Sequence, residues 1–523
     1  MKRARLFVIN SLIMMLTTAI LQSITMVFNI YVSERIGAEG MGLFSLIMSV
    51  NGLMMTVSTG GIHIATVRLV SEAQGTGRGG QISGILIRCT AFALICGTAT
   101  GAVALLCSGL IGNSLLSDPR TVGSIRLLAL TQPLNAFSAV MSGYFGAQRQ
   151  IFKTAAVQLV DEIITVVAVT LGLKLMLPRG IEYSCMAIIF GNSLAHLISA
   201  ILSAVLLAAD ARRYRGGGEL SGITRRMLGI AMPVAVTSYA KSGLSTVKNL
   251  LIPYCLRLAG NSEQEALEQY GMLQGMAFPV VMIPQIVIAS VSGLIVPEIT
   301  RSRAAGKHNN VRYIISRAFH GVSIFAMCAC GILVTYSRRI GSMIYSNGAV
   351  SEYIMWLALL IPVLYMDSVV DAALSGLDEQ VNAMRISIMD SVISIVLVLI
   401  LLPRLGIMGY MITLYVCKIF NYSLSLFRLI RSSGLKLDVM GWIVLPLLSV
   451  LVALMAVKLL ARLASVDTVF STVVEIVSVV YIYSVLLRVT GCVGKSDIIW
   501  LKGLLVGANS KFIAEKQRKM KKI

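Results

Sequence analysis

Long apolar runs, interrupted by short polar or charged segments, dominate the chain. Each run is long enough to cross the hydrocarbon core of a bilayer, which takes roughly 20 helical residues. The break between the first two runs is the least sharp, since it rests on Glu34, Arg35 and the glycines Gly37, Gly40 and Gly42. The sequence predicts fourteen membrane helices, at residues 8–32, 42–66, 84–112, 122–145, 154–177, 184–209, 227–256, 270–296, 314–336, 353–375, 384–402, 406–429, 439–461 and 468–488.

Composition supports a membrane protein and excludes most soluble classes. Of the 523 residues, 56% are hydrophobic and 13% are charged, about half the charged fraction of a soluble domain. No phosphate-binding loop, H-E-x-x-H or G-x-S-x-G motif is present, so we expect no enzyme, no catalytic residues, no metal site and no resident cofactor.

The formal net charge of +21 is unevenly distributed between the two sides of the predicted membrane. Of the 45 Lys and Arg residues, 31 lie in segments on the side of the termini and 11 lie opposite. Lys and Arg collect in cytoplasmic loops, where they face anionic lipid. The distribution predicts a multi-pass protein of the bacterial cytoplasmic membrane with both termini in the cytoplasm. Binding of nucleic acid is therefore a weaker explanation of the basic charge than contact with anionic lipid.

The chain contains an internal repeat. Pro133 and Asp161 recur 229 residues later as Pro362 and Asp390, and matching positions favour a structural role for the two aspartates. Six predicted helices separate the copies, so they cross the membrane in the same direction, as parallel lobes do. The predicted parts are a six-helix lobe at 1–215, a second at 216–435, two further membrane helices at 436–490 and a basic amphipathic tail at 491–523 that lies on anionic lipid.

Two parallel six-helix lobes followed by two helices is the pattern of the multidrug/oligosaccharidyl-lipid/polysaccharide (MOP) flippase superfamily. The stretch Ile30–Leu46 resembles that superfamily's connection between its first two helices, and Gly61–Glu72 resembles the exit of its second helix. Within the superfamily the chain is most similar to stage V sporulation protein B-like polysaccharide transporters, which are related to the lipid II flippase. The resemblance implies alternating access by rocking lobes and transfer of a lipid-linked sugar from the inner to the outer leaflet.

Two lysines in the predicted seventh helix are the first candidates for substrate binding. Lys241 and Lys248 are seven residues apart and share one face, and Pro233 and Pro253 flank them. Insertion of a charged side chain at the centre of a bilayer costs about 2.5 to 3.5 kcal/mol of free energy. A functional or structural interaction must therefore offset this cost at each lysine. One interpretation is a cationic strip for a diphosphate headgroup; the other is a pair that reaches the interface or pairs with acids.

The first predicted helix carries a polar, uncharged face suited to sugar hydroxyls. Gln22 and Asn29 are its candidate substrate ligands. Lipid II flippases have arginines in this helix, whereas here the first is Arg35. Arg35 is therefore a candidate ligand or, alternatively, a loop anchor paired with Glu34 or Glu39.

Two aspartates in the predicted tenth helix are candidates for ion coupling. Asp367 and Asp371 are four residues apart on one face, and two neighbouring carboxylates raise the pKa of at least one. They would couple transport to a proton or sodium gradient or to the membrane potential; the alternative is pairing with Lys418.

The leading functional hypothesis is a flippase for an anionic lipid-linked cell-envelope saccharide, with envelope-synthesis proteins as further partners. A cation-coupled multidrug exporter of the same superfamily is the first alternative. A membrane glycosyltransferase is weaker because the longest predicted outward loop, near Arg257 to Tyr270, is short. An assembly scaffold is weaker because it does not require lysines in the membrane.

Overall fold

The computed structural model describes residues 2–76, 79–148, 150–211, 222–345, 348–435, 437–464 and 469–494. Throughout this described part the chain is helical and contains no strand, which confirms the predicted all-α class. It divides into two compact units: unit 1 comprises residues 1–20, 277–386 and 415–523, and unit 2 comprises residues 21–276 and 387–414. The predicted basic tail from residue 495 onward lies outside the described residues, and the predicted lobe boundaries stay a prediction.

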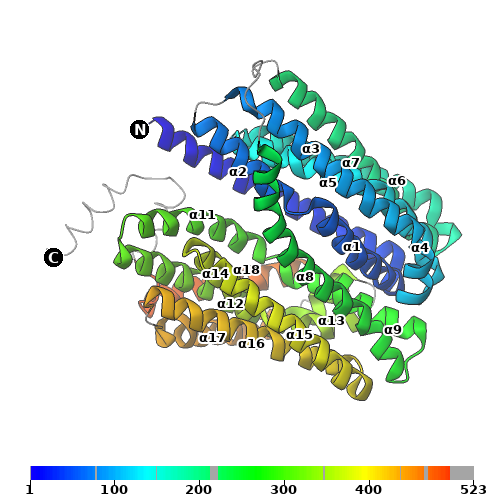
Figure 1. The fold of residues 1–523 in the computed structure, drawn as a ribbon. Coiled ribbons are helices and arrows are strands. Elements are labelled where there is room, and N and C mark those ends of the chain that lie inside the picture. The colour runs from blue at the N-terminus through cyan, green and yellow to red at the C-terminus, as the bar shows by residue number, and fades with distance from the viewer. Residues whose placement is uncertain are drawn as a thin grey trace. The chain divides into compact units, whose positions relative to one another are not determined.

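Unit 2 is built mainly from the helices between α1 and α9 (Figure 1). Their bounds are α1 Lys2–Thr59, α2 Ile62–Gly75, α3 Ile82–Leu106, α4 Ser108–Leu110, α5 Val122–Ala147, α6 Ile151–Met176, α7 Ile181–Ala211, α8 Ile223–Leu258 and α9 Glu263–Tyr270. A π-helical turn at Ile111–Leu115 and a 3-10 turn at Pro119–Thr121 join α4 to α5, and a second π-helical segment, Gly271–Ala277, follows α9. The helices α15 (Gln380–Leu405) and α16 (Ile407–Ser433) each pass from one unit into the other.

Small residues explain how closely the helices of unit 2 pack. Gly97 and Gly101 are one turn apart on α3, and a Cβ at Gly101 would lie 2.5 Å from the carbonyl oxygen of Ala129 on α5. A Cβ at Gly191 of α7 would lie 2.5 Å from a methyl group of Val169 on α6. The hydrophobic effect does not drive helices together within lipid, so close packing contacts of this kind stabilise their association instead.

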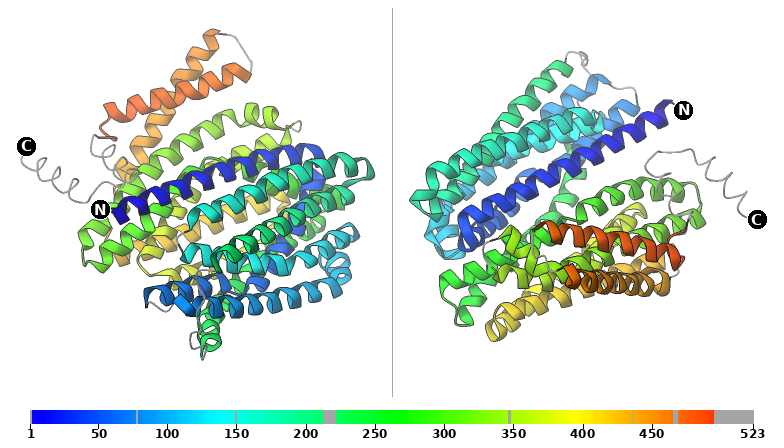
Figure 2. Two further views of the ribbon diagram at one scale, coloured as in Figure 1. Left: turned by 90° about the horizontal axis from the view of Figure 1, so that it is seen from above. Right: turned by 180° about the vertical axis from the view of Figure 1, so that it is seen from behind.

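Unit 1 centres on the long helix α12 (His308–Ile344). Around it lie α11 (Gln285–Ala304), α13 (Ala349–Leu359), α14 (Ile361–Gly376), α17 (Leu445–Ala464) and α18 (Val469–Val489), with the short α10 (Phe278–Met282) before α11. The last two helices pack as a pair, drawn in orange and red in Figure 2. Arg339 of α12 pairs with Glu475 of α18 at 2.8 Å, which gives this half-exposed arginine and nearly buried acid a mutual partner.

The structure agrees with the predicted break between the first two spans and revises the tenth. Within α1 two helices meet at a kink at Gly37, where φ is 72° and ψ is −177°. The predicted tenth span is a pair, α13 and α14, bent by 50°. Among the described residues, eight helices, or nine if the bent pair is one span, are long and apolar enough to cross a membrane; the count of fourteen therefore stays a prediction.

Candidate functional site

A row of polar side chains joins α8 to the second half of α1 in unit 2. Tyr239, Ser242, Thr246 and Asn249 follow each other at spacings of three, four and three residues, so they occupy one face of α8. The hydroxyl of Tyr239 donates to the carbonyl of Val57 at 3.1 Å. We call this hydrogen-bonded contact between the two helices the α1–α8 seam.

Further hydrogen bonds join the same faces of α1 and α8. The Thr246 hydroxyl donates to the carbonyl of Ser49 at 3.1 Å, and the Asn249 amide donates to the Ser49 hydroxyl at 3.0 Å. The hydroxyls of Thr56 and Ser242 are 3.2 Å apart. Polar side chains of this kind hold helices together in a membrane, where no water competes for them.

A polar cavity of about 350 Å³ lies beside the seam, entirely within unit 2. Hydroxyl and amide groups from α1, α8 and the segment after α9 dominate its wall. Tyr270 and Gln274 reach it because Gly271 packs directly against the backbone of Ala38 and Gly42, where a Cβ has no room. The lining residues are Ser45, Met48, Ser49, Gly52, Ser242, Ser245, Thr246, Asn249, Tyr270 and Gln274.

The two candidate lysines lie on α8, which supplies part of the cavity wall, but neither is among the lining residues. At 100° per residue, Lys241 and Lys248 lie about 20° apart around the helix axis and about 10 Å apart along it. Ser245, which lines the cavity, lies between them on the same face. Lys241 is exposed and Lys248 is half-buried.

The other predicted substrate ligands do not line the cavity. Gln22 is exposed and Asn29 is half-buried, both on the first half of α1. Arg35 is exposed, with its guanidinium 5.4 Å from the ring centre of Tyr31. The suggested pairing of Arg35 with Glu39 is wrong: the non-helical Gly37 lies between them, and Glu39 pairs with another arginine.

That arginine is Arg120, which holds two acids together at one end of unit 2. It lies 2.8 Å from Glu39 and 2.8 Å from the buried Asp118. Hydrogen bonds that the Arg120 guanidinium donates to Asp118, and then to Glu39, raise its pKa above the usual range. The cluster therefore joins the bend of α1 to the turn before α5.

The candidate coupling aspartates belong to unit 1. Asp367 is half-buried on α14 and interacts electrostatically with Tyr422 of α16, while Asp371 is exposed one turn later. Between them, Ser368 accepts a hydrogen bond from Gln285 of α11 at 2.8 Å. Within the described residues, no group of three or more His, Cys, Asp or Glu side chains could hold a metal ion.

Sequence reasoning missed the hydroxyls and amides of the cavity. The signal was available in part, because Ser45, Ser49, Gly52 and Thr56 also repeat at spacings of three and four residues. Only the structure shows that this face of α1 meets the polar face of α8.

The model of the polysaccharide biosynthesis protein family matches residues 7–303, more than half of the chain. The chain belongs to this family. Stage V sporulation protein B of Bacillus subtilis (strain 168) is 22% identical over 418 residues, covering 77% of this chain and 79% of the relative. Sporulation protein YkvU of the same organism is 20% identical over 310 residues, covering 58% and 68%.

Solved structures show the fold. The lipid II flippase MurJ in an inward closed conformation matches with a TM-score of 0.67 and 16% identity, covering 90% of this chain and 98% of that one. An inward-facing multidrug resistance MATE family transporter of the MOP superfamily matches with a TM-score of 0.63 and 11% identity, covering 82% and 100%. The family member is thus a multi-pass membrane protein with the fold that the lipid II flippase and the MATE transporter share.

Proposed function

We propose that this family member flips an anionic lipid-linked cell-envelope saccharide across the bacterial cytoplasmic membrane. The observation that carries the proposal is the polar cavity of unit 2, whose wall includes α8, the helix that also carries Lys241 and Lys248. Family membership and the similarity to a lipid II flippase support the same class of substrate.

The chemistry of the wall suits a sugar diphosphate. Two lysines whose positions are about 10 Å apart along the helix can form charge-assisted hydrogen bonds to a diphosphate, which are about twice as strong as neutral ones. Ser245 and Asn249 can exchange hydrogen bonds with sugar hydroxyls. The lining of this cavity, which lies wholly within the described residues, contains no carboxylate, and this disfavours a cationic drug as the cargo.

Movement of the cargo follows the alternating access expected for two parallel lobes. Pro233 and Pro253 lie within α8 on either side of the lysine strip, and each removes a backbone hydrogen bond and allows the helix to bend. Asp367 and Asp371 are the proposed coupling site for protons or sodium ions. Gln22, Asn29 and Arg35 are proposed secondary contacts along the path, and both termini are proposed to be cytoplasmic.

The test is transport by a variant with Gln at both Lys241 and Lys248. Flipping of a polyisoprenyl-diphosphate-linked sugar in proteoliposomes should fall by at least about tenfold, because two charge-assisted interactions are lost. Arg at both positions should retain part of the activity, since charge is kept while geometry changes.

The matched control replaces two exposed lysines outside the cavity, Lys174 and Lys458, with Gln. It should transport at the unmodified rate after normalisation to the protein reconstituted. Full activity of the Lys241/Lys248 double Gln variant would refute the proposed headgroup site. Export of cationic dyes without saccharide transport would favour the multidrug alternative.

A further inference from the structure

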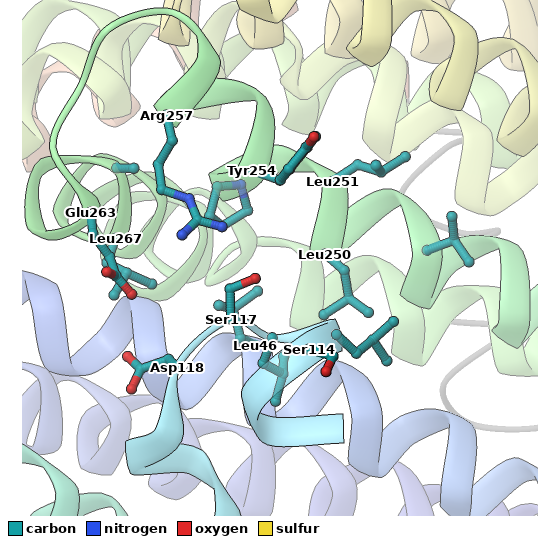
Figure 3. Close-up of a pocket in the computed structure, with 15 residues that line it drawn as sticks. Leu46, Ser114, Ser117, Asp118, Leu250, Leu251, Tyr254, Arg257, Glu263 and Leu267 are labelled. Atoms are coloured by element: carbon teal, nitrogen blue, oxygen red, sulfur yellow. The ribbon is translucent and has the colours of Figure 1, made fainter. Parts of the chain in front are cut away.

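A second cavity of unit 2, of about 280 Å³, lies near the end of α8 and has one charged and one apolar end. Figure 3 shows Arg257, Glu263 and Asp118 gathered at one side, with Leu250 and Leu251 at the other. The proposed saccharide site does not include these residues.

The cavity runs along α8 from its last turn toward its middle. Arg257 lies in the last turn, and Val247, which also lines the cavity, is ten residues earlier, or about 15 Å along the helix. Tyr254 and Val247 are about half exposed on this face, at 48% and 47%. Tyr and Arg at the end of a membrane helix mark the level of lipid headgroups, and the leucines below them lie at the level of acyl chains.

The charges facing the cavity are of both signs. Asp118 is only 3% exposed and is neutralised by Arg120. Arg257 stacks on Tyr254, with 6.0 Å from its guanidinium to the ring centre, and the described residues place no carboxylate within ion-pair distance of it. Glu263, exposed in the first turn of α9, supplies a negative charge on the facing wall. One cation and one anion therefore remain for a ligand.

We infer that this cavity binds a zwitterionic aminophospholipid of the surrounding bilayer, with its phosphate on Arg257, its ammonium on Glu263 and an acyl chain along Leu250, Leu251 and Val247. A lipid diphosphate would bring two anionic groups and no cation to Glu263 and the Asp118–Arg120–Glu39 cluster, which carries net negative charge. A water-soluble zwitterion would leave the apolar end of the cavity without a partner. The inference shares with the proposed function only the assignment of α8 as a membrane helix.

The test uses the purified full chain, delipidated in detergent, and has no transport readout. Phosphatidylethanolamine and phosphatidylglycerol, which share the phosphate but differ in the ammonium, are added separately. Lipid retention by native mass spectrometry and the unfolding midpoint are then measured. Phosphatidylethanolamine should bind more tightly and raise the midpoint further.

Three variants assign the contacts. Arg257→Gln should weaken binding of both lipids about tenfold. Glu263→Gln should remove the preference for phosphatidylethanolamine, and Leu250→Trp should fill the apolar end and block both lipids. Arg179→Gln, an exposed arginine outside the cavity, is the matched control and should bind like the unmodified chain.

Two results would overturn the site. One is equal binding of the two lipids to the unmodified chain. The other is binding by the Arg257 and Leu250 variants that cannot be distinguished from the Arg179 control. Because neither result involves transport, failure of this site leaves the saccharide proposal standing, and failure of transport leaves this site standing.

Discussion

The hydrogen bonds of the α1–α8 seam are expected to stabilise the candidate site, and removing them one by one tests this. Tyr239→Phe and Thr246→Val each remove a hydroxyl that donates to a backbone carbonyl of α1, at 3.1 Å in both cases, and change little else in shape. Thr246 is buried, at 5% exposure, and Tyr239 is half-buried.

The magnitude follows from hydrogen bonds between membrane helices, which average about 0.6 kcal/mol and reach about 1.7 kcal/mol. The double variant should therefore lose about 1.2 kcal/mol of stability if the two contacts add. Thr237→Val is the matched control, because the Thr237 hydroxyl bonds to the carbonyls of Pro233 and Val234 in its own helix and contributes nothing to the seam.

The assay is equilibrium unfolding in mixed micelles, read by alkylation of the buried thiols of Cys185 and Cys255. Both cysteines belong to unit 2 and become reactive only when its packing opens. If the double variant and the Thr237 control unfold at the same denaturant concentration, the seam does not stabilise unit 2 and the reasoning is wrong. Gln at the exposed Lys241 should leave the unfolding curve unchanged, which separates binding from packing.

Three further predictions concern topology, coupling and the arginine cluster. In a cysteine-free background, Ser262→Cys should react with an impermeant reagent from outside and Lys307→Cys should not; the reverse result would invert the proposed orientation. Asn at both Asp367 and Asp371 should abolish the dependence of transport on an ion gradient while substrate still binds, and an unchanged dependence would reduce the pair to structural residues. Arg120→Gln should destabilise unit 2 by about 2 kcal/mol, since it leaves a buried carboxylate without its partner at a site that is only partly solvated; Arg120→Lys should lose less, and equal stability of Arg120→Gln and the unmodified chain would contradict the role of the cluster.

The elements that could be predicted from the sequence are those decided by local chemistry. Apolar length requires helices in a membrane, because every backbone group must be satisfied within the segment. The interruption expected at Glu34 to Gly42 corresponds to the bend at Gly37, a residue that adopts positive φ without strain. What local pattern could not show is that Glu39 turns toward Arg120, which lies 81 residues away along the chain.

At the candidate site, the sequence reveals the two lysines but not the hydroxyl groups that line the cavity. An ammonium group within an apolar run is conspicuous because its insertion is costly, and the spacing of Lys241 and Lys248 alone defines their common face. A hydroxyl group can instead donate a hydrogen bond to a backbone carbonyl of its own helix. It therefore does not interrupt the hydrophobic pattern of the sequence. Thr237 and Thr246 are alike in the sequence of α8, yet one bonds within its helix and the other bonds to Ser49 of α1. Which hydroxyls remain for a ligand is decided by the opposing helix, so the cavity becomes recognisable only when both helices are in place.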